Sequence, residues 1–233
     1  MIQIIPQTTG LRRSLALAVV GLTHFALLSE ATLEEQMLQA IEVAEERYEF
    51  LATSRLASNS ERFVNYTNAG GTWRTQSDAT WTSGFLPGNF WMLYHLTGNT
   101  KWADYAALWD SGVRSRATAT DNDTGFQIFE SFGSALEWAP SLVDVPDYTS
   151  LILTAAQTVT NQRYNATIGA YRGWPERDNT PSDMPFEVIV DMLMNLEIIL
   201  WAGENGGPAE YVDFATQHAD TSWRDNVRED GST

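Results

Sequence analysis

Residues 96–109, LTGNTKWADYAALW, have the pattern of one helix ending, a tight turn and a second helix beginning. Gly and Asn mark the turn, and aromatic and small residues follow it at helical spacing. Residues 202–219, AGENGGPAEYVDFATQHA, repeat the pattern, with Y-x-x-F-A aligned on W-x-x-Y-A of the first stretch. The repeat predicts stacked helical hairpins that bury their apolar faces against one another.

The same helical period dominates the chain after residue 31, whereas strand-like alternation is scarce. We therefore expect an all-α fold with short turns rich in Gly, Pro and Asn. An irregular stretch at 165–184 contains Trp174, and loops of this length are often functional. The expected helices are 32–56, 87–97, 100–117, 126–138, 148–164, 185–203 and 208–224.

Composition limits the class of protein. A chain of 233 residues with 43% hydrophobic and 12% aromatic residues can form one large domain with its own core. The formal net charge of -16 argues against nucleic acid and anionic membranes as partners, because both would be repelled at long range. The absence of Cys excludes disulfides, thiol catalysis and cysteine-bound metals.

The first 31 residues have the pattern of a signal peptide. Arg12 and Arg13 precede an apolar run, SLALAVVGLTHFALL, and small residues stand at 29 and 31, so we expect cleavage near Ala31 and a secreted, extracellular protein. The alternative is a membrane anchor, but the run is shorter than the roughly 20 residues that span a bilayer. Three N-x-T triplets, at Asn65, Asn122 and Asn165, suit a secretory route.

An ionisable residue stands in the apolar stretch 188–201, VIVDMLMNLEIILW. Burying a carboxylate such as that of Asp191 costs several kcal/mol unless it is paired, protonated or in contact with water. On an α-helix, Glu187, Asp191 and Asn195 would recur every fourth residue as one polar stripe. Such a stripe lines a water-filled cavity or forms the solvent face of the helix, and the pattern alone leaves both open.

Three other residues are candidates for a site. Asp123, in DNDTGFQIFES, precedes a helix and is either a cap or a functional carboxylate. Trp81 precedes the bend SGFLPG, where an indole can form a sugar platform or fill the core, and Trp174 lies in the long loop. The three His residues lack a second ligand at i+4 and phosphate loops are absent, so we expect no metal site and no cofactor.

Three segments taken together resemble the unsaturated glucuronyl hydrolases of glycoside hydrolase family 88. They are WTSGFLPGNFW, DTGF and the run VDMLMNLEIILWA followed by VREDGST, and the resemblance covers about residues 60–233. It implies an (α/α)6 barrel of six helical hairpins with the substrate in a central cleft. Residues 32–233 would form its N-terminal part, because seven expected helices make about three and a half hairpins and leave the barrel incomplete.

The resemblance also implies a reaction. Enzymes of this family hydrate the 4,5 double bond of unsaturated glucuronyl oligosaccharides released by polysaccharide lyases and free the unsaturated uronic acid. Asp191 matches the residue that protonates C4 and activates water for attack at C5, and apolar surroundings would disfavour its ionised form. Asp123 matches its partner carboxylate, and Trp81 and Trp174 match tryptophans that bind sugars.

The sequence departs from the family in two places. Asn122 stands where many relatives have a histidine, and the family's substrate-binding segments beyond DGS would follow Thr233, where this sequence stops. Two alternatives therefore stay open beside an unsaturated glucuronyl hydrolase. One is a catalytically dead carbohydrate-binding fragment, and the other is an unsaturated rhamnogalacturonyl hydrolase.

Overall fold

The computed structural model describes residues 32–54, 61–174 and 186–233, and the expected signal peptide at 1–31 lies outside the described residues. The described part is mainly helical, as expected from the apolar period. Its helices are α1 (Leu33–Thr53), α2 (Phe85–Thr97), α3 (Thr100–Val113), the 3-10 helix η1 (Arg114–Thr118), α4 (Thr124–Ile128), the π-helical turn η2 (Phe129–Gly133), α5 (Ser134–Trp138), α6 (Val145–Arg163), the 3-10 helix η3 (Val190–Asn195), α7 (Leu196–Glu204) and α8 (Glu210–Asn226).

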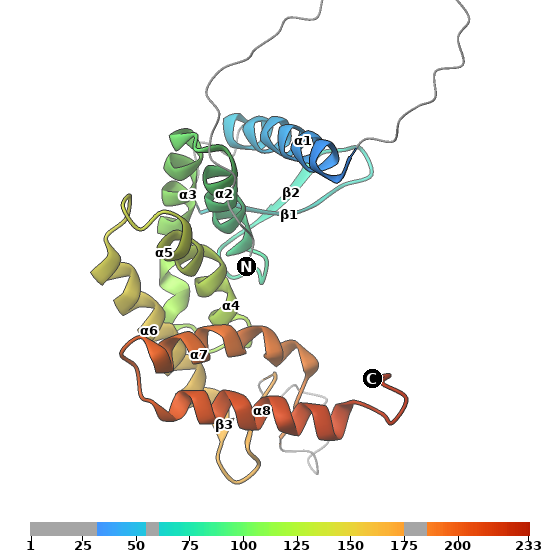
Figure 1. Ribbon diagram of the computed structural model, residues 1–233, viewed down its shortest axis with the longest axis vertical. Helices are drawn as coiled ribbons and strands as arrows, with labels where there is room; N and C mark the ends of the chain where they lie inside the picture. Colours follow the sequence, from blue (N-terminus) through green and yellow to red (C-terminus); the bar gives the residue numbers. More distant parts are fainter. Residues whose placement is uncertain (1–31, 55–60, 175–185) are drawn as a thin grey trace, which may run out of the picture.

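The helices form hairpins stacked along the long axis of the molecule. In Figure 1, α1 to α3 lie at one end, α4 to α6 in the middle, and α7 and α8 at the other end. Short turns join α2 to α3 and α7 to α8, and α3 and α8 each pack against the helix before them. Between the hairpins, α2 packs on η2 and α5, and α4 packs on α7. The expected stack of helical hairpins is therefore confirmed.

The sequence repeat corresponds to equivalent positions in two hairpins. In α3, Trp102 and Ala106 are buried and Tyr105 between them is half-buried. The same classes recur in α8, where Tyr211 and Ala215 are buried and the intervening aromatic residue is half-buried. The repeated aromatic and small residues thus mark the face of the second helix that packs into its hairpin.

Several of the tryptophans fill the core. Trp91, Trp102 and Trp109 are fully buried. The ring of Phe90 stacks on Trp102 with centroids 5.9 Å apart and lies 5.5 Å from the ring of Trp109. The indole N–H of Trp109 donates to the carbonyl oxygen of Arg62 at 3.1 Å, which satisfies its polar atom. These indoles stabilise the packing of α2 on α3 rather than offering a binding surface.

Two small antiparallel hairpins interrupt the helices, and the sequence did not predict them. Their strands are β1 (Phe63–Thr67) with β2 (Trp73–Gln76), and β3 (Tyr164–Asn165) with β4 (Ala170–Tyr171). The first precedes α2, and the second occupies the described beginning of the stretch expected to be an irregular loop. Both lie at ends of helices, where they hold the connecting segments close to the helical stack.

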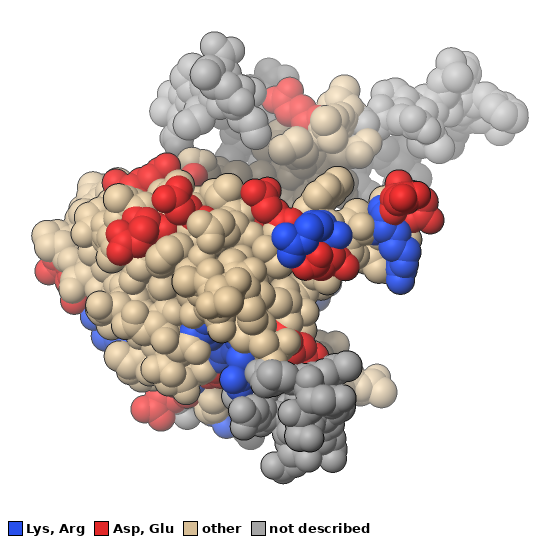
Figure 2. All heavy atoms as spheres, turned by 90° about the horizontal axis from the view of Figure 1, so that it is seen from below, with Lys and Arg blue, Asp and Glu red and all other residues tan. Residues whose placement is uncertain are grey.

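The surface agrees with the acidic composition. On the face shown in Figure 2, acidic and basic side chains are scattered among uncharged ones and the described residues form no single large basic patch. Among those residues, no helix combines the length and the apolar character needed to cross a bilayer.

Candidate active site

Asp123 lies in the turn that leads into α4. Its backbone N–H donates to Asp121 Oδ1 at 3.1 Å, and its carbonyl oxygen accepts from the backbone N–H of Gln127 at 3.0 Å. The carboxyl group is half-buried, and its pKa is raised, chiefly by burial. The negative charges of Asp121 and Asp191 raise that pKa further, whereas a hydrogen bond from Asn122 and the charge of Arg116 oppose the rise.

Asp191 lies in the first turn of η3, and not within an α-helix as expected. Residues 186–189 are non-helical, and Ile189 is extended with φ -118° and ψ 145°. The physical reason is a tertiary hydrogen bond, because the carbonyl oxygen of Glu187 accepts from the backbone N–H of Gly173 at 2.8 Å. The predicted helix 185–203 is therefore wrong in its first part, and the regular α-helix begins only at Leu196.

The surroundings of Asp191 also differ from the prediction. Its side chain is half-buried, and the nearby side chains of Val190, Leu193 and Met194 are 60%, 39% and 44% exposed. The predicted polar stripe does not form, because Glu187 is exposed in the extended segment whereas Asn195 is fully buried. Asp191 thus lies at the border between the core and the surface.

The two predicted carboxylates meet at the side-chain amide of Asn122. Its Nδ2 atom donates to Asp191 Oδ2 and lies 3.4 Å from Asp123 Oδ1. Asn122 is only 2% exposed, so this contact is shielded from solvent. The structure therefore brings together two residues that are far apart in the sequence and that the sequence placed in one site.

Asn195 fastens the two segments that carry the carboxylates. Its Nδ2 donates to the carbonyl oxygen of Asn122 at 3.0 Å, and its Oδ1 accepts from the backbone N–H of Phe126 at 3.1 Å. A Cβ atom on Gly125 would overlap the Asn195 side chain, so a glycine is required where the two segments approach. One buried amide thereby fixes the turn before α4 against η3.

Trp81 lies near the start of α2, close to the beginning of α4. It is 55% exposed, and its ring meets the edge of Phe85 with centroids 6.2 Å apart. Phe85 in turn lies 6.0 Å from Phe126, next to the Asn195 contact. The side-chain amide of Gln127 donates to the carbonyl oxygen of Thr80 at 2.7 Å and so attaches this turn to α4.

Trp174 follows a segment that is attached to the turn bearing Asp123. The buried guanidinium of Arg163 donates to the carbonyl oxygens of Thr120 and Asp121 on one side and of Arg172 and Gly173 on the other. Trp174 itself is 37% exposed, so it is available to a ligand. Trp81 and Trp174 are therefore both exposed indoles on segments that are attached to the turn before α4 or to α4 itself.

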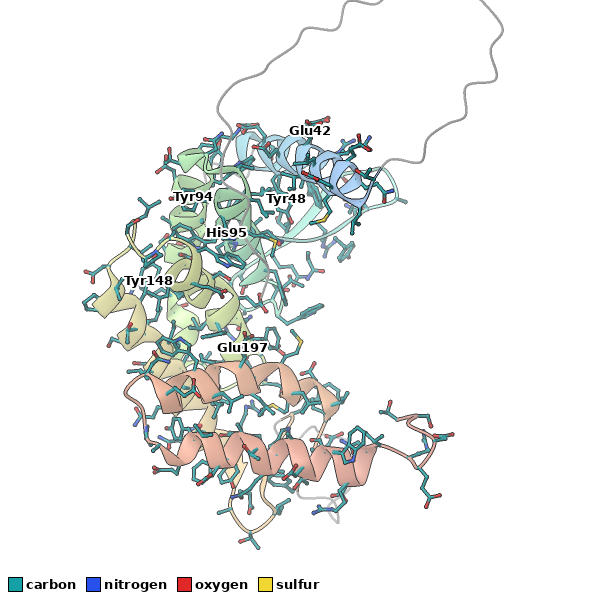
Figure 3. All side chains as sticks on the ribbon, viewed as in Figure 1. Glu42, Tyr48, Tyr94, His95, Tyr148 and Glu197 are labelled. Atoms are coloured by element: carbon teal, nitrogen blue, oxygen red, sulfur yellow. The ribbon has the colours of Figure 1, made fainter. Side chains whose placement is uncertain are left out.

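A second set of acidic side chains lies farther along the same helices. Glu197 lies on the side of α7 that faces α4 and α5 (Figure 3). It is close enough to Glu130 of η2 and Glu137 of α5 for their negative charges to interact. Burial raises the pKa of Glu130 and of Glu197, and Coulomb repulsion within the group adds to each rise. Among the described residues, no group of His, Asp and Glu is arranged to hold a metal ion.

Comparison with known proteins finds relatives in the enzyme class that the sequence motifs resemble. No family model matches the chain. The unsaturated glucuronyl hydrolase of Formosa agariphila is 35% identical over 153 residues, which is 65% of this chain and 36% of that protein. The enzyme of the same name from Bacillus sp. strain GL1 is 27% identical over 187 residues, or 78% of this chain and 48% of that protein.

Solved structures show that the similarity extends to the fold. A crystal structure of an unsaturated glucuronyl hydrolase specific for heparin superposes with a TM-score of 0.74 at 28% identity, and the match covers 84% of this chain. The chain is thus similar in sequence and fold to unsaturated glucuronyl hydrolases. It spans about a third to a half of the length of these relatives, since the matches cover 36% of the Formosa protein and 49% of the solved chain. The helical hairpins seen here correspond to part of the α/α barrel of those structures.

Sequence reasoning missed the residues that assemble this candidate site. Asn122 was noted as a departure from the family's histidine, and Asn195 as a member of a polar stripe that lines a cavity or faces solvent, yet both are buried amides at the carboxylate pair. Arg163 carried no signal, although it is buried and joins two segments of the site. A polar residue in an otherwise apolar helical pattern was the only available hint for Asn195.

Proposed function

We propose that this chain carries the acid pair of an enzyme that hydrates the 4,5 double bond of unsaturated glucuronyl oligosaccharides. These oligosaccharides are the products of polysaccharide lyases, and hydration of the double bond leads to release of the neighbouring sugar. The proposal rests on one observation, which is that Asp123 and Asp191 meet at the amide of Asn122 in a chain that matches unsaturated glucuronyl hydrolases.

The reaction needs one proton donor that later becomes a base. In the proposed sequence, Asp191 gives a proton to C4 of the vinyl ether, and then accepts a proton from the water that attacks C5. The resulting hemiketal opens, the bond to the neighbouring sugar breaks, and one water molecule is consumed overall. Asp191 suits this role because it lies at the border of the surface, where both a sugar and a water molecule can reach it.

Asp123 is proposed as the partner carboxylate that binds ring hydroxyls. The raised pKa of Asp123 keeps a proton on this carboxyl group to a higher pH than a solvated aspartate would keep it. Two neighbouring carboxylates repel each other when both are ionised, so they favour a state that shares one proton. Trp81 and Trp174 are proposed to stack against the sugars, which their exposed indoles allow.

Loss of ultraviolet absorbance by the conjugated double bond tests the proposal. We expect the purified chain to consume an unsaturated glucuronyl disaccharide, and Asp191→Asn to lower the rate at least about a hundredfold, because general acid–base catalysis is lost. Asp104→Asn, on the exposed face of α3, is the matched control and is expected to keep the rate. Equal rates for Asp191→Asn and the wild type would reject the assigned role.

A second candidate function is carbohydrate binding without turnover. The exposed indoles of Trp81 and Trp174 favour it, because an indole face can stack on a sugar without any reaction taking place. Quenching of tryptophan fluorescence by the disaccharide, weakened in Trp81→Ala and unaccompanied by loss of absorbance, would support this candidate over the enzyme. Preference for an unsaturated rhamnogalacturonyl substrate in the same assay would instead favour the related hydrolase.

We also propose that the protein is secreted after removal of residues 1–31. The proposal is supported by Arg12, Arg13 and the apolar run that follows them. Expression in a secretory eukaryotic host is expected to release a protein whose first residue lies close to position 32. An intact N-terminus on protein retained in the cells would contradict secretion.

A further inference from the structure

The side chain of Asn122 is placed between two acids, and its chemistry differs from theirs. An Asn amide has two N–H donors on one nitrogen, and it carries no charge at any pH at which proteins fold. Nδ2 of Asn122 donates to Asp191 and lies within hydrogen-bonding distance of Asp123. One neutral group can therefore offer a hydrogen to each of two carboxylates that otherwise repel each other.

We propose that Asn122 is a positioning residue that holds the carboxyl groups of Asp123 and Asp191 together by donating one amide hydrogen to each. The inference deepens the proposed function and rests on it for its meaning in catalysis. It assigns no contact between Asn122 and the substrate, because the side chain is buried.

The other polar atoms of Asn122 favour one orientation of its side-chain amide. The backbone carbonyl of Asn122 is held by Asn195 at 3.0 Å, so the residue cannot move away from η3 without breaking a buried hydrogen bond. Oδ1 of Asn122 has no hydrogen-bonding partner among the described atoms. Turning the amide over would place that oxygen against ionised carboxylates, which is unfavourable, so the donor end faces the acids while either acid is charged.

The charged groups around the bridge act on Asp123 without a direct hydrogen bond to its carboxyl group. Asp121 lies beside Asp123 and forms an ion pair with Arg116, and Arg163 donates to the backbone of Asp121. Among the described residues, Asn122 is thus the side chain whose hydrogen bonds reach both site carboxylates. Because the amide does not titrate, its hydrogen bonds strengthen or weaken only as the carboxyl groups gain or lose protons.

Nuclear magnetic resonance of the whole chain tests the bridge without substrate. We expect the side-chain NH2 resonances of Asn122 to shift with pH along the same curve as the carboxyl carbon of Asp123. The NH2 resonances of Asn68, whose Nδ2 donates to the hydroxyl of Thr72 at 3.1 Å, serve as the control and are expected to stay constant across that curve. Asn122 resonances that stay constant while Asp123 titrates would overturn the proposal.

A substitution gives the second measurement. Asn122→Leu has nearly the same size and lacks the donor, so the titration of Asp123 is expected to move to higher pH, whereas Asn68→Leu is expected to leave it in place. An unchanged titration in folded Asn122→Leu would also overturn the bridge. If that variant does not fold, the resonances of the wild type decide alone.

These outcomes are separable from the proposed function. Coupled titration without consumption of substrate would keep the bridge and reject the enzymatic activity of the chain. Consumption of substrate with uncoupled resonances would keep the activity and reject the bridge.

Discussion

Raising the pH from about 4 to about 7 is expected to lower the free energy of unfolding by about 4 kcal/mol through one side chain, Asp110. Asp110 is fully buried, and burial raises its pKa from 3.8 to about 7. Over this range the folded protein keeps a proton that the unfolded chain releases. The stabilisation is therefore complete at low pH and is lost as the pH rises through about 7.

Burial favours the neutral form of Asp110, whereas its two hydrogen bonds partly oppose that effect by lowering the pKa. Oδ2 accepts from the indole N–H of Trp91 at 3.0 Å and from the hydroxyl of Tyr148 at 3.2 Å, whereas Oδ1 is buried without a partner among the described atoms. Figure 3 shows Tyr148 within the helical stack, away from solvent-facing α1. Arg114 contributes only a weaker opposing effect on the pKa than burial does.

Denaturant unfolding of the wild type and of Asp110→Asn at a series of pH values measures the effect. The neutral amide mimics the protonated acid, so the difference in unfolding free energy between the two proteins should change by about 4 kcal/mol across the range. Asp104→Asn, which replaces an exposed carboxylate on the same helix, is the control. A difference that is independent of pH would show that Asp110 titrates normally in the folded protein.

Acidification is expected to destabilise the protein through His218, with an effect of about 3 kcal/mol between pH 6.5 and about 4. Burial lowers the pKa of His218 to about 4. Between pH 6.5 and about 4, the unfolded chain therefore binds a proton at His218 that the folded protein does not bind. Stability from this group is complete above pH 6.5 and disappears as the pH falls through about 4. The side chain is fully buried on α8.

The hydrogen bond of His218 gives a reason beyond burial. Its Nδ1 accepts from the backbone N–H of Tyr171 at 3.0 Å, which places the proton of the neutral ring on Nε2. Protonation of Nδ1 would set two N–H groups against each other and release β4 from α8. The segment that leads from Tyr171 to Trp174 would lose one of its attachments.

His218→Asn keeps an acceptor near the position of Nδ1 and removes the titration. On acidification from pH 6.5 to about 4, its unfolding free energy should therefore rise by about 3 kcal/mol relative to that of the wild type. His95→Asn, at an exposed position on α2, is the control. Because Asp110 and His218 act in opposite directions over the same range, the wild type should show a flatter pH profile than either variant. Identical slopes for His218→Asn and the wild type would contradict the prediction.

The helical hairpins could be predicted because their signals are local. Gly98 and Asn99 mark the turn between α2 and α3, and the side chain of Asn99 caps α3 by accepting from the backbone N–H of Lys101. The apolar period then identifies the buried face of each helix. The first β-hairpin also had a local signal, since two runs rich in aromatic and β-branched residues flank the turn at 68–71.

The site could be predicted only in part. The short motifs around Asp123 and Asp191 singled out both acids as candidates, but the geometry that brings them together depends on contacts between distant segments. Residues 186–189 are extended because they pair with Gly173, and that pairing overrides the helical pattern of their own sequence. The role of Asn195 likewise depends on backbone groups near Asn122, which helical spacing does not reveal.

The π-helical turn η2 constrains how this chain can change in length. It is continuous with α4 and α5, and its Glu130 carbonyl fits against Gly88 of α2, where a Cβ atom would overlap it. The turn contains one residue more than the α-helical turn that would replace it, so the faces of α4 and α5 stay in phase across the extra residue. A residue added or removed within a regular α-helix would instead rotate its two ends by about 100° relative to each other. A change in the number of residues is thus easier to accommodate at η2 than inside α4 or α5.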